Sequence, residues 1–297
     1  MFKLLNQIII TSIPLVPKYF VSLFANKYVA GTTINDCLNT VEKINSQKLK
    51  ATVDILGEHT KDKIEADQIT DEYCSILNEI NKRDLDCNIS IKPSHIGTDI
   101  DLDLYLKNLN KIHASAVKFK NFVRIDMEDS SLTDSTLDSY HAISNPNIGI
   151  VLQAYLHRTE ADLDKLKGSS NIRLCKGIYN ESEKISFKNR DDINNNYLRL
   201  LKKAFDKKIF TGIATHDPLL IEKSLEIIKQ NNINKSMFEF QMLHGVPMNR
   251  HIKNILKCGY NVRIYVPFGQ NWYDYSIRRI KENPNISKYI IQNLFKK

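Results

Sequence analysis

Glycine is scarce in this chain, and its placement excludes the common nucleotide-binding loops. The 297 residues include 10 glycines, about half of the usual share of about 7%. No two glycines are separated by a single residue, so the dinucleotide-binding run G-x-G-x-x-G is absent. No G-x-x-x-x-G-K-[ST] run occurs either. A nucleotide held on a Rossmann turn or a P-loop is therefore excluded.

Cysteine is also rare and never paired at short spacing. The five cysteines are odd in number and form no C-x-x-C pair, so neither a zinc site nor a disulfide framework is predicted. No pair of histidines has i, i+4 spacing, and we expect no metal. This usage is typical of a reducing compartment, and we predict a cytoplasmic protein.

Long hydrophobic runs are missing as well. The uncharged run from Leu4 to Pro17 is shorter than the roughly 18 to 20 residues that a membrane-spanning helix needs. It has no arginine and no small-residue cleavage site, so it resembles neither a transit nor a signal peptide. We predict that residues 1–45 form a helical arm packed on the main domain, with a peripheral membrane contact as a weaker hypothesis.

The composition otherwise indicates a soluble folded domain with a basic balance. Hydrophobic residues make up 42% and charged residues 26%, and the formal net charge is +8. The basic residues are dispersed among 34 acidic ones without a basic block, so nucleic acid is not an expected partner. No Gly-, Pro- or Ser-rich linker divides the chain, and we predict one domain over residues 46–297.

Eight short apolar or β-branched runs alternate with amphipathic helical segments. Strand-helix alternation repeated eight times favours a closed α/β barrel of the (βα)8 type over an open doubly wound sheet. Helical spacing is clearest at residues 102–109, 197–205 and 219–228. The expected strands are residues 51–56, 88–92, 122–126, 148–155, 172–176, 210–215, 238–243 and 262–266.

Polar side chains recur where these strands end, which is the rim that carries the active site of such a barrel. For Glu128, Asp129 and Ser130 the simpler interpretation is an acidic helix start. Lys176 could be a point charge for an anion or a Schiff-base amine. Arg278 and Arg279 could form an exposed helix face with Glu282 or an anion site. Residue types alone leave these alternatives open.

Seven motifs, in the same order, resemble the proline dehydrogenase family. The tail pattern Y-x-x-R-R-x-x-E is the most specific of them. The motifs are RIDMEDS at 124–130, LQAYL at 152–156, RLCKGIY at 173–179, ATH at 214–216, FEFQMLHG at 238–245, VRIYVPFG at 262–269 and WYDYSIRRIKENP at 272–284.

This resemblance implies a distorted (βα)8 barrel that binds FAD non-covalently and oxidises L-proline to 1-pyrroline-5-carboxylate, with a quinone as electron acceptor. The length resembles the monofunctional form, so 1-pyrroline-5-carboxylate dehydrogenase is expected as a separate chain. Flavin bound on the barrel rim would explain the missing glycine-rich turn. A hydroxyproline substrate is the main alternative, and a Schiff-base or phosphate-handling barrel using Lys176 is the next.

The resemblance also assigns residues. Asp126 and Arg173 would be catalytic, with Arg173 beside the reactive flavin nitrogen. The family often has Ala at the position of Ile178 and Asn at that of Asp217. Substrate contacts would come from Lys92, Leu243, Tyr265, Tyr275, Arg278, Arg279 and Glu282, and flavin contacts from Met127, Gln153, Arg173, Lys176, Gly177, Ile178, Tyr179, Thr215, His216 and Gln241.

Overall fold

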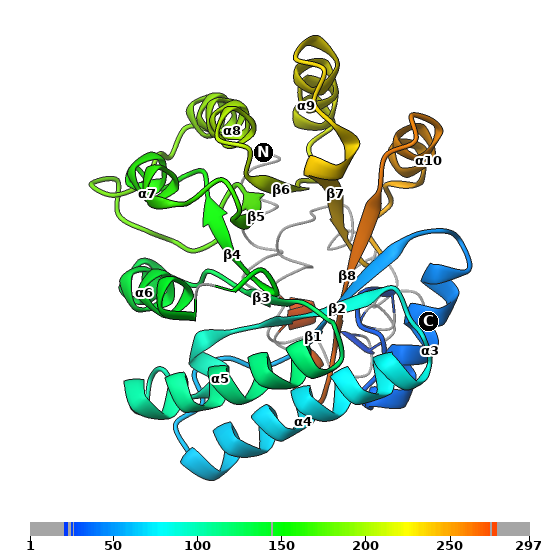
Figure 1. The fold of residues 1–297 in the computed structure, drawn as a ribbon, viewed down its shortest axis with the longest axis vertical. Helices are drawn as coiled ribbons and strands as arrows, with labels where there is room; N and C mark the ends of the chain where they lie inside the picture. The colour runs from blue at the N-terminus through cyan, green and yellow to red at the C-terminus, as the bar shows by residue number, and fades with distance from the viewer. Residues whose placement is uncertain (1–20, 23–24, 26, 144, 274, 278–297) are drawn as a thin grey trace, which may run out of the picture.

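The computed structural model describes residues 21–277 apart from 23, 24, 26, 144 and 274. Eight parallel strands close into a barrel in sequence order, and the helices lie in a ring outside it (Figure 1). The predicted (βα)8 barrel and its eight strand positions are confirmed. The strands are β1 Lys50–Ile55, β2 Cys87–Ile91, β3 Val123–Ile125, β4 Ile148–Gln153, β5 Asn171–Cys175, β6 Phe210–Ala214, β7 Phe238–Leu243 and β8 Val262–Phe268.

The helices cover the outside of the barrel. Their starts follow the strand ends, and Asp62 and Asp101 each accept a backbone hydrogen bond as the N-cap of a helix. The helices are α3 Ile34–Asn45, α4 Lys63–Lys82, α5 Leu102–Lys118, α6 Thr133–Ile143, α7 Thr159–Lys165, α8 Arg190–Asp206, α9 Pro218–Gln230 and α10 Asn249–Lys257, with short 3-10 turns η2 Pro93–Ile96, η3 Ser130–Leu132 and η4 Lys235–Met237.

The strands carry apolar and polar residues on alternate faces although both faces are buried. On β1, Ala51, Val53 and Ile55 join the hydrophobic core between sheet and helices. The alternate residues Thr52 and Asp54 face the barrel interior. There Thr52 bonds to Asn88 on the neighbouring strand β2, and Asp54 bonds to Lys92 just after that strand. The barrel interior is therefore polar, and its buried charges need partners from other strands.

The N-terminal part packs on the barrel where the described residues begin. α3 contacts β1 and β8, and the N–H of Ala30 donates to the carbonyl of Pro267 at 2.9 Å. The predicted arm over residues 1–45 stays a prediction, because residues 1–20 lie outside the described part. Within the described residues, no helix combines the length and apolar character needed to cross a bilayer.

Candidate functional site

A cavity of about 910 Å³ opens at the carboxyl ends of the strands, which is within the usual size range of ligand pockets. Of the 18 residues assigned from the sequence, 15 line it, and Arg278, Arg279 and Glu282 lie outside the described residues. The 15 are Lys92, Asp126, Met127, Gln153, Arg173, Lys176, Gly177, Ile178, Tyr179, Thr215, His216, Gln241, Leu243, Tyr265 and Tyr275.

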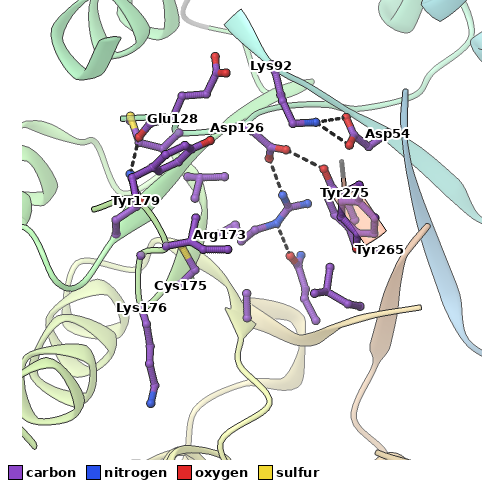
Figure 2. Close-up of a pocket in the computed structure, with 18 of the residues that line it drawn as sticks. Asp54, Lys92, Asp126, Glu128, Arg173, Cys175, Lys176, Tyr179, Tyr265 and Tyr275 are labelled. Atoms are coloured by element: carbon purple, nitrogen blue, oxygen red, sulfur yellow. Dashed lines mark hydrogen bonds and ion pairs between the residues drawn. The ribbon is translucent and has the colours of Figure 1, made fainter. Parts of the chain in front are cut away.

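Asp126 and Arg173 form the centre of the cavity (Figure 2). Arg173 Nη1 donates to Asp126 Oδ1 at 2.6 Å, and the same oxygen accepts from Ser90 Oγ at 2.7 Å. The hydroxyl of Tyr265 donates to Asp126 Oδ2 at 2.9 Å. Burial first, and then the charge of Asp126, raises the pKa of Tyr265, so this hydroxyl stays protonated and acts as a donor. The Arg173 guanidinium also lies over the Tyr265 ring, 5.0 Å from its centroid.

Lys92 pairs with a carboxylate that the sequence analysis missed. Its Nζ donates to both oxygens of Asp54, at 2.8 and 2.6 Å (Figure 2). Burial opposes the charge on Lys92, but the nearby carboxylates of Asp54 and Asp126 outweigh burial and raise the Lys92 pKa. Burial raises the pKa of Asp54, although Lys92 acts against it. The alternation in residues 51–56 was the available signal, because it places Asp54 on the polar face.

Lys176 lies apart from the Asp126–Arg173 centre and points away from it (Figure 2). Its Nζ donates to Asp217 Oδ2 at 2.7 Å, and Arg190 donates to the same oxygen at 2.9 Å. Burial raises the pKa of Asp217, but the hydrogen bonds that Lys176 and Arg190 donate outweigh burial and lower this pKa to about 2. An amine held by a carboxylate and turned outward favours the role of a point charge at the rim over Schiff-base chemistry.

Glu128 is a pocket residue rather than an exposed helix start. It is 1% exposed and accepts hydrogen bonds from the N–H and hydroxyl of Ser94 at 2.8 and 2.6 Å. These bonds join η2 to the segment that follows β3, and burial raises the pKa of Glu128 despite them. Asp129 caps η3. The simpler interpretation is therefore wrong for Glu128 and correct for Asp129.

Arg124 adds a second buried cation below Arg173. It donates to the carbonyls of Ile150 and Asn171 at 3.0 and 2.7 Å, and no ion pair to it occurs within the described chain. Burial, together with the charge of Arg173, lowers the pKa of Arg124 to about 9. Gly149 provides the space, since a Cβ there would lie 2.4 Å from the Arg124 guanidinium. The barrel interior thus holds positive charge that favours an anionic ligand.

Gly177 and His216 support the rim around the cavity. Gly177 has a φ of +106°, and a Cβ would lie 2.0 Å from the ring of Tyr155, so only glycine fits there. His216 Nε2 accepts from the N–H of Leu243 at 2.9 Å, which joins the ends of β6 and β7. Packing at the rim thus accounts for the glycine at position 177 and for this hydrogen bond of His216, and the flavin contacts of both residues stay a prediction.

A buried histidine beside the cavity makes stability depend on pH. His95 is 1% exposed, and burial first, then the charge of Lys92, lowers its pKa from 6.5 to about 3. The unfolded chain binds a proton near pH 6.5 that the folded chain does not, so stability present above pH 6.5 is lost as the pH falls towards 3. We expect His95 to account for a loss of about 2 kcal/mol between pH 7 and pH 5.

Urea unfolding at the two pH values checks this expectation. The loss of stability on acidification should be about 2 kcal/mol smaller in His95→Leu than in the native chain. The exposed His141→Leu is the control and should behave as the native chain. Equal pH dependence in His95→Leu and the native chain would contradict the expectation.

The family model and the related proteins all indicate the same family for this chain. The family model described as proline dehydrogenase matches residues 37–292. Proline dehydrogenase 2 of Bacillus subtilis strain 168 is 37% identical over 276 residues, covering 92% of this chain and 91% of the relative. The proline dehydrogenase of Deinococcus radiodurans is 31% identical over 282 residues, covering 92% and 90%.

A solved structure shares the barrel. Proline utilization A from Bdellovibrio bacteriovorus superposes with a TM-score of 0.82 at 24% identity, over 88% of this chain and 32% of that one. The family match spans most of the chain, and the Bacillus and Deinococcus relatives are matched over nearly their whole length. On these grounds the chain belongs to the proline dehydrogenase family.

Proposed function

We propose that this chain is an FAD-dependent proline dehydrogenase that oxidises L-proline to 1-pyrroline-5-carboxylate in proline catabolism. The observation that supports this most directly is the convergence of Arg173, Asp126, Tyr265 and Lys92 in one cavity at the carboxyl ends of the strands. Asp126, Arg173 and Tyr265 come from three of the motifs that pointed to the family, whereas Lys92 lies outside all of them. The conclusion combines family membership with a site of matching chemistry.

The residues present fit a flavin. The cavity is large, the Arg173 guanidinium at its base is paired with Asp126, and Arg124 adds a buried positive charge below it. Lys176 at the rim offers a charge for phosphate oxygens, and Gln153 and Thr215 line the wall between. Bound FAD would accept the hydride that proline loses, and the protein would supply orientation and electrostatics.

The substrate would lie against Lys92, Tyr265 and Leu243. Lys92 supplies a cation for the proline carboxylate, held in place by Asp54. Tyr265, Tyr275 and Leu243 offer an apolar wall for the pyrrolidine ring. Arg278 and Arg279 are proposed as the main carboxylate clamp, oriented by Glu282. A ligand fixed at its carboxylate and its ring has one orientation, which the removal of a hydride requires.

Asp126 is proposed to orient Arg173 and Tyr265 rather than to remove a proton. Its two oxygens accept from Ser90, Arg173 and Tyr265. A general base needs a lone pair directed at the substrate, and here three hydrogen bonds from neighbouring side chains occupy most of the lone pairs of Asp126. Arg173 is then a fixed cation beside the reacting groups, where it stabilises developing negative charge.

A visible spectrum tests the function. The purified protein supplied with FAD should show a band near about 450 nm that bleaches when L-proline is added without oxygen. Hydroxyproline is added to a parallel sample, and faster bleaching by it would favour the alternative substrate. A spectrum unchanged by both amino acids would refute the proposal, and borohydride trapping on Lys176 would then test the remaining alternative.

The electron acceptor and location are further proposals. We propose a quinone as acceptor, 1-pyrroline-5-carboxylate dehydrogenase as a separate chain, and a cytoplasmic protein with peripheral membrane contact. Co-sedimentation with vesicles should fall when residues 1–30 are deleted, and equal activity and partitioning would remove the role of that segment.

A further inference from the structure

Below Arg173, a chain of buried hydrogen bonds continues away from the cavity. Arg173 Nε donates to Gln241 Oε1 at 2.6 Å, and Gln241 Nε2 donates to Glu239 Oε1 at 2.8 Å. Glu239 in turn accepts from Arg263, from Nε at 2.5 Å and from Nη2 at 3.2 Å. Arg173, Gln241 and Glu239 are 8%, 6% and 5% exposed. The guanidinium at the centre of the site is therefore connected to a carboxylate beneath it.

Arg173 and the Glu239 carboxylate together determine which way the Gln241 amide faces. An amide can present either its oxygen or its NH₂ group, whereas an ionised carboxylate only accepts and Arg Nε–H only donates. Burial opposes the charge on Glu239, but the adjacent Arg263 guanidinium outweighs it and holds the Glu239 pKa below its usual range. With Glu239 ionised, the NH₂ group must face Glu239 and the oxygen must face Arg173.

Strand register leaves room for this connection. Gly212 on β6 pairs with Arg173 on one side and Glu239 on the other. A Cβ on Gly212 would lie 2.4 Å from Gln241 Nε2, so a side chain there would displace the amide. Because Gly212 has no side chain, the Gln241 side chain can extend between Arg173 and Glu239.

We propose that Glu239 is a positioning residue for the reaction: through Gln241 it fixes the side-chain conformation of Arg173. Glu239 lies below the cavity wall, and it acts on the substrate only through these two side chains. The role rests on the proposed function, because it assumes that Arg173 faces the reacting groups. The competing explanation is that Glu239 only neutralises Arg263.

Flavin reduction by proline in a single turnover is the first measurement. Glu239→Gln removes the ionised acceptor that holds the Gln241 NH₂ group, and the limiting rate at saturating proline should fall about 10-fold. The proline dissociation constant should change by less than about threefold, since the clamp is untouched. The exposed Glu226→Gln, whose native residue pairs with Lys223 on the outer helix α9, is the matched control and should keep the native rate.

A second variant distinguishes a loss of Arg173 positioning from a loss of stability. Glu239→Gln leaves Arg263 buried without its carboxylate, whereas Glu239→Leu with Arg263→Met removes both charges, a change that often preserves stability. This double variant lacks any acceptor for Gln241, and its rate should also fall about 10-fold or more. A native rate in the folded double variant would overturn the proposal.

The Gln241→Leu background separates the two explanations. If Glu239 acts through Gln241, adding Glu239→Gln to Gln241→Leu should not slow flavin reduction further. If Glu239 only neutralises Arg263, the second change should slow the reaction by the same factor in both backgrounds. That outcome would also overturn the proposal.

A spectroscopic measurement does not depend on turnover. In the FAD-loaded protein without proline, the Arg173 Nε–Hε signal can be assigned in a ¹⁵N correlation spectrum by its loss in Arg173→Lys. It should shift in Glu239→Gln and stay in place in Glu226→Gln. An unmoved signal would refute the positioning role. A shifted signal in an enzyme that proline fails to bleach would refute the proposed function alone.

Discussion

Replacing Arg173 by alanine should slow flavin reduction at saturating proline about 100- to 1000-fold, the range seen when a fixed charge-stabilising donor is removed. Arg173 is the cation that contacts Asp126, Ser90 and Gln241 at 2.6, 3.1 and 2.6 Å. Without it, Asp126 loses its charged partner, and the Tyr265 ring loses the guanidinium that lies over it. The loss should appear in the limiting rate more than in proline affinity, because the carboxylate clamp is separate.

Anaerobic stopped-flow bleaching at several proline concentrations checks this expectation. Arg199→Ala is the matched control, because Arg199 is on the outer helix α8 and pairs with Glu160. The flavin content of each variant must be measured first, so that a lost cofactor is not taken for a slow reaction. A limiting rate within about threefold of the native enzyme would show that Arg173 is not catalytic.

Replacing Lys92 by methionine should destabilise the fold by about 3 to 5 kcal/mol, the usual cost of leaving one buried charge without its partner. The side chains of Lys92 and Asp54 are 16% and 2% exposed, so water can replace the lost ammonium only in part. Tyr73 lies 3.4 Å from Asp54, too far for a strong hydrogen bond to compensate. The stability of this barrel therefore depends on a residue of its proposed substrate site.

Urea unfolding of the flavin-free protein measures this effect apart from ligand binding. Adding Asp54→Asn to Lys92→Met should restore most of the lost stability, because no charge is then buried alone. Lys111→Met is the control, since Lys111 and Asp71 are 50% and 62% exposed and such pairs contribute less than about 1 kcal/mol. A loss below about 1 kcal/mol for Lys92→Met would contradict the expectation.

The sequence predicted the fold well because the alternation of strands and helices is local. Each strand is a short apolar run, and each is followed by a segment with helical spacing, so neither assignment needs knowledge of distant residues. Small differences occur at the ends: the strand expected over 148–155 ends at Gln153. The cavity was found because polar residues at strand ends must converge once eight parallel strands close.

Asp54 and Glu239 are functional candidates that the sequence alone did not identify. Both are inside strands rather than at strand ends, so the search for polar residues at the rim passed over them. Their importance comes from partners on other strands, Lys92 for Asp54 and Arg263 for Glu239. Pairing of this kind depends on the register between strands, which no local pattern records.

The sequence by itself determined the barrel, the family and 15 of the residues that line the cavity. Only the tertiary structure decided which of these residues touch. Tyr265 and Asp126 are 139 residues apart, yet they share a hydrogen bond across the barrel. The physical reason is that strand periodicity is a property of neighbours in the chain, whereas the pairing of buried charges follows from barrel closure and strand register.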